Sequence, residues 1–119
     1  MRAYVRKRIE RAEMVKRWRE HVRRIAQSAR RVLGDVEVYV FGSAVEGRLT
    51  ASSDVDLLIV CEKAPLDFEE YEDLKERILR GAGLDTRSPF QLHIVDKDGA
   101  RFYLENLRVR AERILRPQE

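Results

Sequence analysis

The sequence predicts a single α/β domain over residues 1–119, because short apolar runs typical of buried strands alternate with longer amphipathic segments typical of helices. Strands are indicated at 36–41, 54–60 and 90–95, where Val, Ile, Leu, Tyr and Phe cluster between Gly, Ser and Asp residues. A chain of 119 residues is long enough to bury one hydrophobic core. Helical periodicity accounts for most of the remaining sequence.

Residues 4–33 predict one long basic amphipathic helix, which no Gly or Pro interrupts before Gly34. At 1.5 Å per residue this helix would be about 45 Å long, more than the width of so small a domain, so its first turns are expected to project. Its C-terminal half is expected to pack on the sheet, and its N-terminal half to face solvent or another chain. The apolar stripe consists of Val5, Ile9, Ala12, Val15, Trp18, Val22, Ile25, Ala29 and Val32.

Charge is divided unevenly along the chain. Residues 1–33 hold twelve Lys or Arg against three Glu, and the rest of the chain is net acidic, for a total of +3. Nucleic-acid binding is not favoured, because the basic helix lacks a helix-turn-helix partner and an aromatic platform. No apolar run is long enough for a membrane span, and the N-terminus lacks the apolar centre of a signal peptide. The one cysteine, Cys61, permits no internal disulfide, so a cytoplasmic location is expected.

A second helix is predicted between Asp67 and Gly81. Asp67 is placed to cap its first turn, with Glu70 completing a capping box. Leu66 and Tyr71 are expected to form a hydrophobic staple across the same turn. The face expected to pack on the sheet carries Phe68, Tyr71, Leu74 and Ile78. The C-terminal segment 99–119 is also expected to be helical, although residues 107–111 alternate in the manner of an edge strand.

The most informative stretch joins the first two strands. The first strand ends in Gly42 and Ser43, ten residues intervene, and the second strand opens with Asp54-Val55-Asp56. Since alternate side chains of a strand share a face, Asp54 and Asp56 are expected to lie close together. At 4 Å and an effective dielectric near 20 their repulsion would be about 4 kcal/mol, which a divalent cation would relieve. Mg²⁺ suits such a pair, because it takes one or two carboxylates together with substrate phosphates.

Gly42 and Ser43 supply the other half of a phosphate site. A glycine allows a sharp turn and close approach of the backbone to a ligand, and free N–H groups at the start of a helical turn attract anions. The glycine spacing of residues 42–47 also occurs in P-loops. That motif requires Lys and then Ser or Thr, whereas Arg48 and Leu49 follow here, so a P-loop is excluded.

This pattern resembles the signature of the polymerase-β-like nucleotidyltransferases, and most of all that of their minimal members: Gly-Ser, ten residues, and then Asp-x-Asp. The resemblance implies a small mixed sheet with helices mainly on one face, and a catalytic core over residues 34–98. It also implies Mg²⁺-dependent transfer of a nucleoside monophosphate, expected to be AMP, from an NTP to a hydroxyl. Asp54 and Asp56 would be the catalytic metal ligands. Gly42 and Ser43 would bind phosphate, with Arg48 as a further candidate.

The third strand departs from the pattern of this family. The family usually places a third carboxylate on the matching strand, where this sequence has His93. A histidine can act as a base or a metal ligand, although Mg²⁺ prefers oxygen, and a lone histidine in a strand is more often structural. We take His93 as a catalytic candidate and leave Asp96 and Asp98, which follow it, as alternatives.

The resemblance also suggests partners. Members of this size are similar to antitoxins whose partner is a HEPN ribonuclease toxin, and some of them add AMP to a tyrosine of that toxin. ATP or another NTP, a HEPN-type protein, and a homodimer through the N-terminal helix are therefore the expected interactions. A partner subunit that binds nucleotide without turnover is an alternative, and an autoregulatory DNA-binding protein is a third reading.

Overall fold

The computed structural model describes residues 2–106 and 110–116 of the chain. Its strands form one mixed sheet in the order β3-β2-β1-β4, which confirms the predicted α/β class. Strand β1 runs antiparallel to both β2 and β4, whereas β2 and β3 are parallel. The strands are β1 (Glu37–Phe41), β2 (Val55–Val60), β3 (Phe90–Val95) and β4 (Ala111–Leu115).

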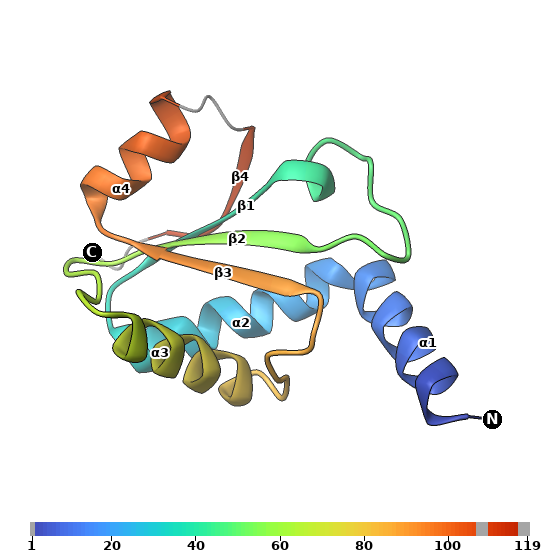
Figure 1. The fold of residues 1–119 in the computed structure, drawn as a ribbon. Helices are drawn as coiled ribbons and strands as arrows, with labels where there is room; N and C mark the ends of the chain where they lie inside the picture. Colours follow the sequence, from blue (N-terminus) through green and yellow to red (C-terminus); the bar gives the residue numbers. More distant parts are fainter. Residues whose placement is uncertain (1, 107–109, 117–119) are drawn as a thin grey trace.

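Helices cover the two faces of the sheet unequally (Figure 1). Helices α2 (Trp18–Leu33) and α3 (Phe68–Gly81) pack against each other and beneath one face. The short α4 (Lys97–Arg101) continues into a π-helical turn (Phe102–Asn106) on the other face. The prediction that helices lie mainly on one face is therefore confirmed. In the ranges that the structure describes, every helix is too short or too polar to cross a membrane.

The larger core lies between the sheet and the α2–α3 layer. Val22, Ile25 and Ala29 of α2 recur at three- and four-residue steps and are fully buried. Strand alternation directs Leu57 and Ile59 into the same layer. Each of the larger side chains contributes about 1.5–3 kcal/mol on burial. A smaller cluster on the opposite face consists of Phe41, Leu58, Val60 and Ala100, so β2 is buried on both sides.

The helix predicted over residues 4–33 is broken at Arg17 into α1 (Ala3–Lys16) and α2. Arg17 adopts φ −105° and ψ 32°, although no Gly or Pro is nearby. The bend buries Val15 and carries Arg11 to the loop before β2, which a straight helix running past the sheet would not do. Figure 1 shows α1 turned away from α2 at one end of the sheet. Residues 2–10 are all exposed, as expected for projecting turns.

The C-terminal segment also differs from the prediction. It is helical to Asn106, but residues 111–115 form the edge strand β4 on β1 instead of a helix. Without β4, one side of β1 would present unpaired backbone groups, so strand pairing outweighs the helical pattern of this segment. The predicted alternation at 107–111 lies partly outside the described residues, which omit 107–109 and 117–119.

Helix α3 begins as predicted, but its first turn does not reach the core. The Asp67 carboxylate accepts a hydrogen bond from the N–H of Glu70 at 2.8 Å, which confirms the cap. Leu66 and Phe68 are 89% and 76% exposed, so the predicted staple and the inward position of Phe68 are wrong. Tyr71 is the first residue of this face to reach the sheet. Its hydroxyl donates to the Leu92 carbonyl at 3.3 Å and accepts from the Ile94 N–H at 3.0 Å on the edge of β3.

Helices α2 and α3 approach most closely where Ser28 faces the end of α3. The buried Ser28 Oγ donates to the Ile78 carbonyl at 2.6 Å. A Cβ added at Gly81 would overlap that hydroxyl and lie 3.3 Å from the Ser28 Cβ. Glycine at position 81 is therefore set by the contact between the two helices, since its backbone is not left-handed.

We predict that Gly81→Ala lowers the free energy of unfolding by about 1–3 kcal/mol, because the added methyl overpacks this contact. Urea unfolding measures the change. The same substitution in a Ser28→Ala background should cost less, since the overlapping hydroxyl is gone. If the overlap is unimportant, Gly81→Ala should instead stabilise the chain by up to about 1 kcal/mol through its better helix propensity.

Candidate active site

The bend after β1 lies directly against an acidic side chain of β2. Phe41, the last residue of β1, is opposite Asp56 in the antiparallel register. The chain then turns through Gly42 at φ 77°, and a short turn follows in which the N–H groups of Val45 and Glu46 donate to the Gly42 carbonyl at 3.1 Å. A Cβ at Gly42 would lie 3.2 Å from Asp56 Oδ2. Both the left-handed backbone and this close approach require glycine.

His93 and Tyr103 extend from Asp56 as a chain of polar groups. His93 Nε2 lies 3.3 Å from Asp56 Oδ1, and the Tyr103 hydroxyl lies 3.5 Å from His93 Nδ1. With the proton on Nε2, His93 donates to Asp56 and accepts from Tyr103; with the proton on Nδ1, it donates to the Tyr103 oxygen. The side chains of Asp56 and His93 are 33% and 32% exposed, so a ligand can reach both. The structure thus brings Gly42, Asp56 and His93 together.

Tyr103 is a member of the site that no motif in the sequence indicates. Its ring lies 5.7 Å from that of Phe41 and 5.8 Å from that of His93, centroid to centroid. Burial raises the pKa of the Tyr103 phenol, and Tyr71 and Asp56 raise it further, so the hydroxyl keeps its proton beside His93. Tyr103 belongs to the π-helical turn, and a tyrosine in an irregular C-terminal segment carries no signal that would mark it.

The other acid of the pair has a cationic partner. Asp54 lies just before β2 with its side chain 52% exposed, and its Oδ1 is 2.5 Å from Nη2 of Arg11. Arg11 Nη1 also donates to the carbonyl of Ser53 at 3.3 Å. Part of the negative charge of the two acids is therefore compensated within the protein itself. Sequence reasoning missed Arg11, since it is 43 residues away and is one of twelve cations in the first 33 residues.

Arg48 and Ser43 lie in the loop between β1 and β2. The Arg48 guanidinium is paired with Glu46 at 2.5 Å and its side chain is 69% exposed. The Arg48 N–H donates to the Ser43 carbonyl at 2.9 Å, which closes the loop onto the turn after Gly42. The predicted phosphate role of Arg48 therefore requires it to leave Glu46. Asp96, an alternative to His93, caps α4 by accepting from the Gly99 N–H at 2.8 Å.

The side chains of the site from which a metal could take oxygen ligands are the two carboxylates of Asp54 and Asp56. Across residues 2–106 and 110–116, no group of three or more His, Cys, Asp or Glu side chains is arranged to hold a metal. The described residues therefore do not form a closed structural zinc site. Asp54 and Asp56 offer the one or two carboxylates that Mg²⁺ takes alongside phosphates. The Asp54 carboxylate is already engaged by the Arg11 guanidinium, so a metal ion at Asp54 would share or displace that partner.

Comparisons with known proteins identify the family and the fold of the chain. The family model described as "Nucleotidyltransferase domain" matches residues 5–109. A crystal structure of a proposed nucleotidyltransferase from Sulfolobus solfataricus shares 24% identity and a TM-score of 0.50, covering 91% of this chain and 84% of that one, and so shares its fold. A second proposed nucleotidyltransferase structure shares 28% identity, with a TM-score of 0.48, over 76% of this chain and 94% of that one. No curated protein matches the chain significantly.

We predict that Gly42→Ala and Gly47→Ala differ in their effect on the site. Both residues have a left-handed backbone, with φ of 77° and 70°, so each substitution should cost about 1–2 kcal/mol of stability. An added Cβ meets the Asp56 carboxylate at Gly42 but nothing within 4 Å at Gly47. Binding of ATP with Mg²⁺, measured by calorimetry, should therefore weaken strongly in Gly42→Ala only. Equal weakening in the two variants would contradict the assignment.

Proposed function

The chain belongs to the nucleotidyltransferase domain family, and from this premise we propose that it transfers AMP from ATP to a hydroxyl group, with Mg²⁺ as cofactor and pyrophosphate as product. The observation that carries the proposal is the approach of the Gly42 bend to Asp56, where an added Cβ would lie 3.2 Å from the carboxylate. This contact supports the proposal because the backbone proposed to bind phosphate and the acid proposed to bind metal are adjacent, as a Mg²⁺-bound triphosphate requires.

The residues would divide the work as follows. The backbone amides that follow Gly42, together with Ser43, bind the β- and γ-phosphates. Asp54 and Asp56 would hold Mg²⁺, which when bound neutralises charge that develops on the phosphates. In the tautomer whose Nδ1–H donates to Tyr103, His93 Nε2 makes no hydrogen bond to the Asp56 carboxylate, and this nitrogen would accept the proton of the attacking hydroxyl once Asp56 is turned to the metal. The acceptor oxygen then bonds to the α-phosphorus as the bond from that phosphorus to the β-phosphate oxygen breaks.

A protein hydroxyl is the proposed acceptor. The candidate that the family resemblance supplies is a tyrosine of a HEPN-type toxin, which would make this chain the antitoxin of the pair. Apolar side chains exposed on α1 support a protein partner, because Tyr4, Val5 and Ile9 are 69%, 42% and 47% exposed. A second copy of the chain is the alternative occupant of α1.

A second candidate function is a partner subunit that binds nucleotide but does not turn it over. It is favoured by one observation, the Arg11 guanidinium that engages Asp54, and by one implication of the family resemblance, that His93 stands where a third carboxylate is expected. The two functions are separated by incubating the purified full chain with ATP labelled on the α-phosphate, Mg²⁺ and a candidate partner. Label on the partner supports transfer, and stable binding without label supports the second function.

We predict that Asp56→Asn lowers the rate of label transfer by about 10²–10³-fold, because the variant loses the charge that holds the metal beside the phosphates. Asp73→Asn is the matched control, since Asp73 is an exposed acid of α3 paired with Arg77 at 3.8 Å. Its rate should equal that of the wild type. Full transfer by Asp56→Asn would refute the role given to Asp56.

We predict that His93→Gln lowers kcat by about 10²–10⁴-fold, the range typical of a general base. His93→Asp should recover part of the loss, because it restores a carboxylate that can accept the proton. His21→Gln is the control: it is the other histidine of the chain and packs on Phe90 with ring centroids 5.6 Å apart. A kcat unchanged in His93→Gln would assign His93 a structural role.

A further inference from the structure

Helix α1 reaches the candidate active site through a single side chain, Arg11. Its Nη2 lies 2.5 Å from Asp54 Oδ1, and its Nη1 donates to the Ser53 carbonyl at 3.3 Å. In the part of the chain that the structure describes, no other side chain of α1 hydrogen-bonds a residue outside the helix. The hydrogen-bonded attachment of α1 to the body is thus made at one of the two acids assigned to the metal, while Lys7 of α1 acts on Asp85 only through its charge, which helps to lower the pKa of that carboxyl.

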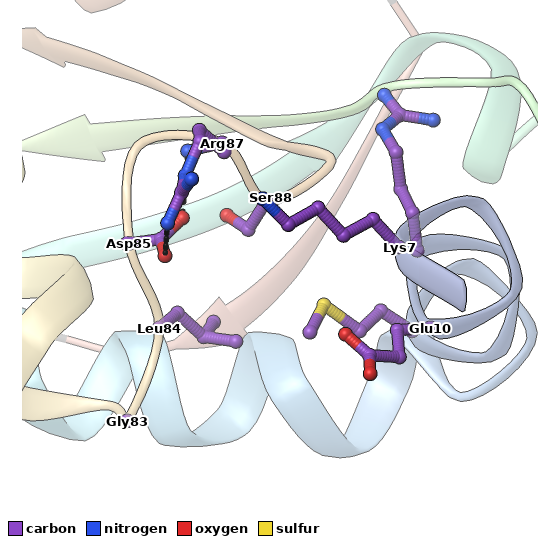
Figure 2. Close-up of a pocket in the computed structure, with 9 residues that line it drawn as sticks. Lys7, Glu10, Gly83, Leu84, Asp85, Arg87 and Ser88 are labelled. Atoms are coloured by element: carbon purple, nitrogen blue, oxygen red, sulfur yellow. Dashed lines mark hydrogen bonds and ion pairs between the residues drawn. The ribbon is translucent and has the colours of Figure 1, made fainter. Parts of the chain in front are cut away.

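Most residues of α1 are exposed to solvent. Val15, near its C-terminal end, is its one buried residue in the described range. A cavity of about 290 Å³ separates α1 from the loop before β3, and its walls include Lys7, Glu10, Met14 and Ser88. Figure 2 shows Lys7 extended from α1 across this gap toward Ser88. The Ser88 hydroxyl, on the loop side of the gap, is buried without a hydrogen-bond partner in the described residues.

The junction between α1 and α2 is suited to movement. Arg17 interrupts the helix, and on its C-terminal side α2 is fixed by the fully buried Val22 and Ile25. On its N-terminal side, α1 has 14 residues, a length at which an isolated helix is marginal in water. A released α1 would therefore turn about Arg17 and fray, while the core remains intact.

Arg11 and a divalent cation compete for the same carboxylate. The guanidinium occupies Oδ1 of Asp54, and two positive groups on one carboxylate repel each other. We propose that α1 is a hinged gate: Arg11 holds Asp54 when the gate is shut, and a divalent cation binds Asp54 when it is open. The two equilibria are linked. A bound cation therefore destabilises the Arg11–Asp54 contact by the same factor by which that contact lowers the affinity for the cation.

The gate is tested with metal alone, without ATP or acceptor. The affinity of the full chain for Mn²⁺, a spectroscopic substitute for Mg²⁺, is measured from the electron paramagnetic resonance signal of the free ion. Arg11→Met should bind Mn²⁺ about two- to fivefold more tightly than wild type, the range expected for loss of a partly exposed ion pair. Arg8→Met removes the same charge from the same helix, where Arg8 contacts only Tyr4 in the described structure. Its affinity should match that of the wild type.

Hydrogen exchange reports the position of α1 independently of affinity. Saturating Mg²⁺ should speed amide exchange across residues 3–16 in the wild type, and Arg11→Met should exchange rapidly even without metal. In Asp54→Ala, exchange should be rapid and unaffected by Mg²⁺. Trp18, the single tryptophan and the first residue of α2, should change its fluorescence with Mg²⁺ in the wild type but not in Arg11→Met.

The gate is overturned if Arg11→Met and Arg8→Met bind Mn²⁺ equally, or if saturating Mg²⁺ leaves exchange of α1 unchanged in the wild type. Acceleration by Mg²⁺ that persists in Asp54→Ala would also overturn it. The gate rests on the proposed function only in assigning Asp54 to a cation. Tighter Mn²⁺ binding by Arg11→Met without any label transfer would support the gate and refute the enzyme. Label transfer together with equal Mn²⁺ affinities of Arg11→Met and Arg8→Met would support the enzyme and refute the gate.

Discussion

The contact between the Gly42 bend and the Asp56 carboxylate is the constraint around which the site is built. It requires a residue without a side chain at the end of β1 and an acid on β2 directly opposite Phe41. The antiparallel register of β1 and β2 fixes that pairing, and the core between the sheet and α2–α3 holds the register in place. His93 joins the pair because β3 runs parallel to β2 and places it opposite Leu58.

Local patterns in the sequence predicted the parts of the site that depend on strand geometry. Gly42 follows from a strand boundary and Asp56 from alternation along a strand, and both are short-range properties, whereas His93 became a candidate through the family resemblance. Arg11 could not be predicted in this way, because tertiary packing alone distinguishes it from the other cations of the first two helices. Tyr103 is a similar case, since the path of the irregular turn after α4 decides where its hydroxyl lies.

The two errors in secondary structure have a common physical origin. The apolar stripe of residues 4–33 is continuous, yet the helix is broken at Arg17, and the bent form buries Val15 and pairs Arg11 with Asp54. Residues 111–115 fit a helix, yet they pair with β1 because that strand has an open side. In both places the structure follows a tertiary contact and not the continuous helix that the local sequence pattern favours. The ion pair of Arg11 is also a direct contact between the basic segment and the acidic remainder of the chain.

The hydroxyl of Tyr71 has a consequence for how this protein behaves at high concentration. Strand β3 is an edge of the sheet, and the carbonyl of Leu92 and the N–H of Ile94 are the groups to which a foreign strand would add. Tyr71 engages both from α3. A side chain of α3 thus occupies two backbone groups on the open edge of β3, which contains neither a proline nor an Asp, Glu, Lys or Arg that would discourage addition of another strand.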